Sequence, residues 1–182
     1  MELIQIVKDI ADVLKNFDSE HPIHKNFSPG IGPFGEPQLI KEISNRLNSL
    51  DDLYQTQIKR TPDLVVNGQW AVEFKIVRPF GDNGDIAENW SVNMLHPYEG
   101  NTSLIGDAIK LNKLTAYSQK AVILIGFEHL VPLISLDPLV ASFEVIIQNV
   151  ICLNISPKIE EKRIDLVHPQ HQIVRIIGWE IL

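Results

Sequence analysis

Apolar residues recur every three or four positions in four stretches of the chain, the pattern of helices that bury one face. These stretches cover residues 2–17, 37–50, 103–118 and 137–151. Pro37 suits the first turn of the second helix, and Thr102 or Ser103 can cap the third. Asp137 can cap the fourth helix, with Pro138 as its first helical residue.

Five shorter stretches have the composition of β-strands. They cover residues 63–66, 69–77, 120–127, 163–167 and 172–179. The first two flank Asn67-Gly68 and predict a hairpin, and the third is an almost unbroken apolar run, typical of a central strand covered on both faces. The order of elements predicts one α/β domain over residues 1–182, with a mixed central sheet flanked by helices and an N-terminal helical segment over about 1–35.

Composition and charge exclude several classes of protein for this chain. The chain has 182 residues, 45% of them apolar and 21% charged, which is enough for a full hydrophobic core. Its formal charge of −7 excludes a broad positive field, so any contact with nucleic acid must be local. Cys152 is the only cysteine, which excludes an intrachain disulfide and a zinc cluster built from cysteines. We expect a cytoplasmic protein without membrane contact.

The predicted hairpin carries a group of charged residues. Pro62-Asp63 is followed after nine residues by Glu73-Phe74-Lys75. Side chains two apart on a strand share a face, so Glu73 and Lys75 project together, away from a fully apolar face. That apolar face consists of Trp70, Val72, Phe74 and Ile76. A Glu and a Lys two apart are most often a solvent-exposed pair, but here the neighbours on their own face, Ala71 and Val77, fit a protein interior.

The length of the hairpin turn decides whether Asp63 can join this group. A two-residue turn at Asn67-Gly68 places Asp63 opposite Val72, on the wrong face of the sheet. An odd loop corrects the parity: residues 67–69 place Asp63 opposite Glu73, and residues 66–68 place it opposite Ala71. We therefore predict an odd connection or a bulge, with Gly68 in the left-handed conformation.

The motif and its place on adjacent strands resemble the PD-(D/E)XK nuclease superfamily, which has the restriction-endonuclease-like fold, over about residues 35–127. The resemblance implies that Asp63 and Glu73 bind Mg²⁺ or Mn²⁺, with the Phe74 carbonyl as a further ligand. It also implies that Lys75 positions or activates the attacking water, so we expect Lys75 to act in chemistry more than in folding.

The superfamily often adds an acidic residue from the helix before the hairpin, and two residues compete for this role. Glu36 extends the inward stripe of Leu39, Ile40 and Ile43, whereas Glu42 lies off that stripe. We therefore assign Glu36 to the catalytic group, with Asp63, Glu73 and Lys75. Glu42 is expected to be solvated.

The activity implied by the resemblance is Mg²⁺-dependent hydrolysis of DNA, as an endonuclease in restriction or repair. Arg78, Lys110 and Lys113 are the residues that we expect to contact the substrate phosphates. The alternative is a catalytically inactive nuclease fold that serves as a binding or interaction module. A homodimer is left open.

Two loop regions attract notice beside the motif. Residues 78–101 form a long segment without periodicity, and Trp90, His96 and Tyr98 in it can form a wall of the active cleft. His168 and His171 are separated by two residues, and we expect them in a solvent-exposed turn rather than at a zinc site.

Overall fold

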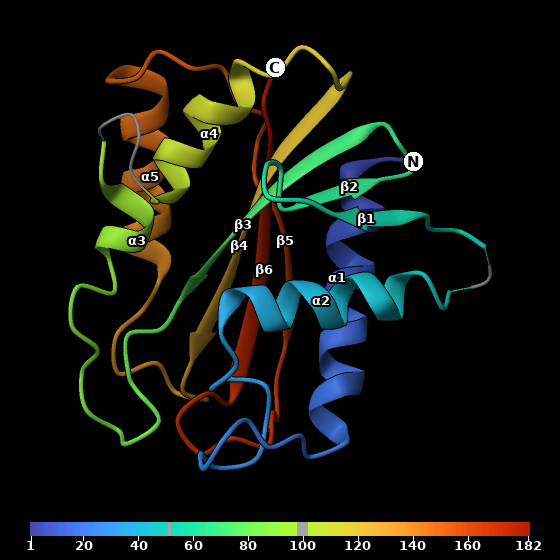
Figure 1. Cartoon of the computed structure of the whole chain (residues 1–182). Coiled ribbons are helices and arrows are strands. Elements are labelled where there is room, and N and C mark those ends of the chain that lie inside the picture. The colour runs from blue at the N-terminus through green and yellow to red at the C-terminus, as the bar shows by residue number, and fades with distance from the viewer. Residues whose placement is uncertain (51, 98–101) are drawn as a thin grey trace.

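The computed structural model describes residues 1–50, 52–97 and 102–182 (Figure 1). The helices are α1 (Leu3–Ser19), α2 (Glu36–Leu47), α3 (Val92–Leu95), α4 (Leu104–Asn112) and α5 (Asp137–Asn149). The strands are β1 (Thr56–Ile58), β2 (Leu64–Val66), β3 (Trp70–Val77), β4 (Gln119–Glu128), β5 (Ile159–Arg163) and β6 (Ile173–Glu180). Among these described helices, none combines the length and the apolar character needed to cross a membrane.

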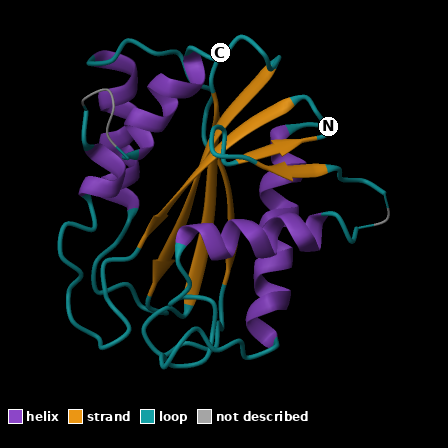
Figure 2. Cartoon of the chain, in the orientation of Figure 1, coloured by secondary structure: helices purple, strands orange, loops and turns teal. Residues whose placement is uncertain are grey.

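The strands form one mixed sheet in the order β1-β2-β3-β4-β6-β5. Only β3 and β4 of the described strands run parallel, and all other neighbours are antiparallel. Helices α1 and α2 lie on one side of the sheet, and α3, α4 and α5 lie on the other (Figure 2). The predicted α/β class with a mixed, helix-flanked sheet is therefore confirmed.

Strand β3 is buried along its whole length because both sides of the sheet are covered. Its residues Trp70, Val72, Phe74 and Ile76 join the core beneath α1 and α2, as their alternation predicts. Ala71 and Val77 join the second core, beneath α4 and α5. Glu73 and Lys75 lie between them on that second side, so their charges are placed inside the molecule.

Several predicted element bounds are wrong, for identifiable reasons. Asp137 does not cap α5, because Leu136 is the N-cap and the Asp137 carboxylate pairs with Arg175 at 2.7 Å. Helix α4 ends at Asn112 rather than 118, since the chain returns to the sheet at Gln119. The predicted strand 163–167 lies instead at Ile159–Arg163, a charged edge strand without apolar alternation. The sequence pattern did not predict the short elements β1 and α3.

His168 and His171 are buried, which corrects the expectation of an exposed turn. Their rings stack with centroids 4.4 Å apart. His168 Nε2 lies 2.6 Å from Asp82 Oδ1, and His171 Nε2 donates to the carbonyl of Phe80 at 2.9 Å. Gly32 packs so closely on the His171 ring that an added Cβ would overlap with Nδ1. The pair thus ties the segment after β3 to the connection before β6.

Burial makes the stability of this arrangement depend on pH. It lowers the pKa of His171 from 6.5 to about 4, so the folded protein holds His171 neutral while the unfolded chain protonates near 6.5. The His171 contribution to stability is therefore present above pH 6.5 and is lost as the pH falls toward 4. We expect His171→Gln to lose less stability than the wild type over this range, by about 1–3 kcal/mol in urea unfolding. His21→Gln, at an exposed histidine, is the control, and equal pH profiles for His171→Gln and the wild type would contradict the assignment.

Candidate active site

The hairpin register brings Asp63 beside Glu73. Strands β2 and β3 pair Leu64 with Val72 and Val66 with Trp70, so the connection is the three-residue loop 67–69. The predicted odd connection is confirmed, and Gly68 adopts the expected positive φ of 68°. Extending this register by one residue places Asp63 opposite Glu73.

Strand β2 pairs with β3 only as far as Leu64 and Val72, so the edge of β3 beyond Val72 has no strand partner. Two carboxylates take its place: Asp63 Oδ2 accepts from the Phe74 amide at 2.9 Å, and Glu36 Oε2 accepts from the Ile76 amide at 3.3 Å. Because N–H and C=O of a strand residue point to the same edge, the Phe74 carbonyl faces this edge too. The first residue of α2, Glu36, thus lies at this edge of the sheet.

Lys75 is held between two carboxylates from different helices. Its Nζ lies 3.2 Å from Glu36 Oε1 and 3.3 Å from Asp107 Oδ2, and the residue is 9% exposed. The choice of Glu36 over Glu42 is supported by this contact, since Glu42 pairs with Arg46 on the outer surface of α2 at 3.6 Å. Removing a buried ion-pair partner is destabilising. That Lys75 acts in chemistry more than in folding stays a prediction, which the melting temperature and the cleavage rate of a Lys75 variant test together.

Asp107 of α4 is a member of the cluster that the sequence analysis missed. Lys110 Nζ lies 3.0 Å from Asp107 Oδ1 and 2.9 Å from Glu73 Oε1, and so links α4 to β3. The signal was present, because Asp107 lies on the inward stripe of α4 with Leu104, Ala108 and Leu111. Ser103 caps this helix by accepting from the Gly106 amide, as predicted for one of two candidate residues.

The electrostatics of the cluster show an excess of negative charge. Among the described residues, the carboxylates of Glu36, Asp63, Glu73 and Asp107 face the ammonium groups of Lys75 and Lys110. Burial raises the pKa of Glu73 to about 8, with further increases from the carboxylates of Asp63 and Asp107. The Lys110 ammonium, which donates to Glu73, opposes this rise, and the net direction favours a protonated Glu73.

The same cluster keeps its lysines charged. Burial by itself lowers the pKa of Lys75, but the carboxylates of Glu36 and Asp107 outweigh burial and raise the pKa above its ordinary value. Burial likewise raises the pKa of Glu36, partly offset by Lys75. Lys75 is thus fixed as a cation beside a carboxyl group whose pKa is raised by burial.

The three residues expected to bind phosphate have different positions. Lys110 belongs to the cluster, and its side chain is 42% exposed. Lys113 is the exposed C-cap residue of α4. Arg78 follows β3 but turns inward, donating from Nη2 to the Phe34 carbonyl, with its guanidinium 5.5 Å from the Phe127 ring centroid.

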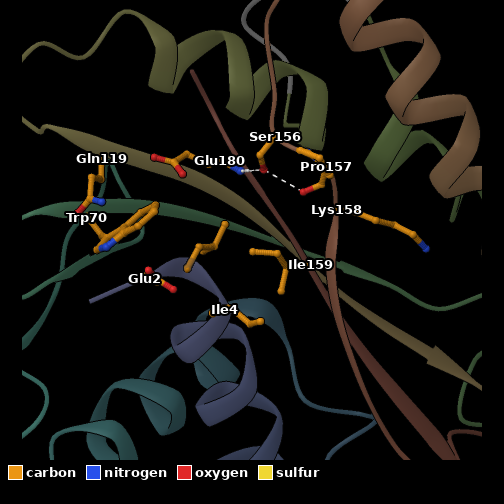
Figure 3. Close-up of a pocket in the computed structure, with 10 residues that line it drawn as sticks. Glu2, Ile4, Trp70, Gln119, Ser156, Pro157, Lys158, Ile159 and Glu180 are labelled. Atoms are coloured by element: carbon orange, nitrogen blue, oxygen red, sulfur yellow. Dashed lines mark hydrogen bonds between the residues drawn. The ribbon is translucent and has the colours of Figure 1, made fainter.

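Residues 78–101 were expected to form a wall of the active cleft, and the structure describes residues 78–97 of this segment. The segment after β3 folds back on itself through a bridge between Phe80 and Ile86, and Trp90 packs on the core beneath α4 and α5. Tyr98 lies outside the described residues. A cavity of about 440 Å³ opens elsewhere, among Trp70, Gln119 and Glu180 (Figure 3), and none of the candidate site residues lines it.

The cluster has the chemistry of a hard-cation site, although the lysines balance part of its charge. In the described part of the chain, no three carboxylate, imidazole or thiol groups converge in a metal-ligand arrangement. The fit rests on the donor types: Asp63 and Glu73 supply adjacent carboxylates, the Phe74 carbonyl faces the same edge, and their crowding raises the pKa of Glu73. These residues suit Mg²⁺ or Mn²⁺ in ligand type.

Comparison with known proteins adds no family to this picture. No protein-family model, curated protein or solved structure matches the chain. The site is therefore interpreted from its own residues.

The raised pKa of Glu73 predicts a specific effect on stability. The folded protein holds this proton up to about pH 8, whereas the unfolded chain releases it near 4.5. The stabilising contribution of the proton is fully present below pH 4.5 and is lost as the pH rises to 8. Without divalent cations, the melting temperature of Glu73→Gln should therefore rise relative to the wild type between pH 5 and pH 8. Glu42→Gln should show a constant difference, and the same constancy for Glu73→Gln would refute the assigned proton.

Proposed function

We propose that this protein is a metal-dependent deoxyribonuclease with a site of the PD-(D/E)XK type. The observation that carries the proposal is the burial of Glu73 and Lys75 on one face of β3, next to Asp63 and Glu36. A fold that needed only stability gains little from burying several charges together. Active sites often hold clusters of buried charged groups. Hydrolysis of a phosphodiester needs carboxylates to bind a cation and an ammonium to contact the water or the phosphate.

The proposed cation ligands are the carboxylates of Asp63 and Glu73 and the carbonyl of Phe74. When bound, the cation would offset charge on the phosphate and lower the pKa of a coordinated water. Among the described residues of the cluster the carboxylates outnumber the ammonium groups. A divalent cation would replace the proton of Glu73 as the balancing charge.

Lys75 has the geometry of a group that directs a water molecule. Its ammonium is held by Glu36 and Asp107 on two sides, so its position is fixed before a substrate arrives. The raised pKa keeps it charged, which makes it a donor toward an attacking water or a phosphate oxygen. Lys110 is half exposed at the same cluster. Its ammonium can leave Glu73 and bind a phosphate of the substrate instead.

The alternative is a nuclease-like fold without catalysis, acting as a binding module. The observation that favours it is the contact of 2.9 Å between Lys110 and Glu73, which places an ammonium against a proposed cation ligand. A permanent internal ion pair would leave the carboxylates closed to metal.

Cleavage assays separate the two functions. Supercoiled plasmid, linear duplex and single-stranded DNA are incubated with the protein in Mg²⁺ or Mn²⁺, with chelator as the background. We expect cleavage by the wild type and at least a roughly 100-fold slower rate for Lys75→Met, which keeps the aliphatic volume but removes the ammonium. Lys162→Met, at an exposed position on β5, should cleave like the wild type.

Circular dichroism of each variant confirms that it is folded. Nicking or linearisation of closed plasmid would identify an endonuclease. Equal rates for wild type and folded Lys75→Met, or no cleavage of any substrate in either metal, would reject the nuclease in favour of the binding module.

A further inference from the structure

A second cavity adjoins the proposed active site. It has a volume of about 180 Å³ and lies where β3 ends, with Ile76 and Arg78 in its wall. The Ile76 amide donates to Glu36, which in turn pairs with Lys75. The cavity is therefore next to the charged cluster along the same strand, one residue beyond Lys75.

The lining of this cavity combines aromatic rings with polar groups. Phe80 and Trp90 supply the rings, and Glu88 and Asn93 supply a carboxylate and an amide. A volume of about 180 Å³ accommodates one planar heterocycle. Glu88 and Arg78 place one charge of each sign in the wall, so the ligand that fits is uncharged, planar and able to form hydrogen bonds.

The aromatic wall is fixed in advance by the buried histidines. The ring of Phe80 packs edge-on against His129 with centroids 4.7 Å apart, and its carbonyl accepts from His171. Two residues further on, Asp82 pairs with His168. A platform that is already ordered loses little conformational entropy when a ligand binds.

Arg78 adds a positive charge to the wall of the cavity, opposite in sign to the Glu88 carboxylate. Its guanidinium donates from Nη2 to the Phe34 carbonyl, which fixes its position. The two charges balance each other, so the lining suits an uncharged heterocycle that carries both hydrogen-bond donors and acceptors.

We propose that this cavity receives one unpaired nucleobase, stacked on Trp90, and that the substrate is therefore DNA with an unpaired nucleotide next to the scissile phosphate. The inference rests on the proposed nuclease function and adds a substrate class to it. Base stacking provides affinity without charge, which suits a protein with a net charge of −7. It also explains how a chain without a broad basic surface can hold nucleic acid locally.

Tryptophan fluorescence tests the proposal without catalysis. Trp179 is buried and Trp70 lines the separate cavity of Figure 3, so Trp90 is the tryptophan in the wall of this cavity. The protein, in chelator, is titrated with a mixed-sequence single strand of about 12 nucleotides. We expect this strand to quench the emission. A blunt duplex of the same length and an abasic strand of the same charge should leave it unchanged.

Two substitutions locate the signal. Trp90→Phe should remove the quenching but retain binding of a labelled strand, because a ring is still present. Trp90→Ala should weaken that binding by roughly 5- to 150-fold. If Trp90→Ala fails to fold, Ala87→Leu, at another lining position, fills the cavity instead and should weaken binding to a similar degree.

The outcomes separate this inference from the nuclease function. Quenching by the duplex or the abasic strand as strong as that by the single strand, or no quenching at all, overturns the cavity assignment, even if the protein cleaves plasmid. Quenching that Trp90→Phe abolishes supports the cavity, even if no metal produces cleavage.

Discussion

Two backbone amides at the edge of β3 determine where the charged side chains of this protein gather. Strand β2 pairs only as far as Leu64, so the amides of Phe74 and Ile76 have no strand partner and are satisfied by Asp63 and Glu36. An unpaired amide at a buried edge is costly, and a carboxylate is a strong acceptor for it. The same bonds bring two carboxylates to the place where Glu73 and Lys75 leave the sheet.

Once these carboxylates are in place, the remaining geometry follows from charge. Lys75 is drawn between Glu36 and Asp107, and Lys110 closes the cluster against Glu73. The carboxylates still outnumber the ammonium groups among the described members, and the raised pKa of Glu73 is the consequence. Such a cluster is less stable than an apolar one of equal volume, a cost that proteins tolerate where a reaction needs the charges.

Much of this arrangement can be predicted from residue patterns, because β3 is strictly apolar on one face and α2 has a clear inward stripe. The parity argument also succeeds, since Asp63 and Glu73 can meet only across an odd loop. Other features depend on contacts between distant segments. Asp137 is recruited by Arg175 instead of capping α5, and the stacked pair of His168 and His171 is buried by loops whose packing no local pattern reveals.

The central claim is that a divalent cation replaces the proton of Glu73. Calorimetric titration with Mn²⁺ at pH 7, in two buffers of different ionisation enthalpy, measures the protons released on binding. Because the pKa of Glu73 is raised to about 8, the account predicts release of close to one proton per ion. It also predicts no binding to a folded protein that carries both Asp63→Asn and Glu73→Gln. Binding without proton release, binding that survives the double substitution, or no binding to the wild type would contradict it.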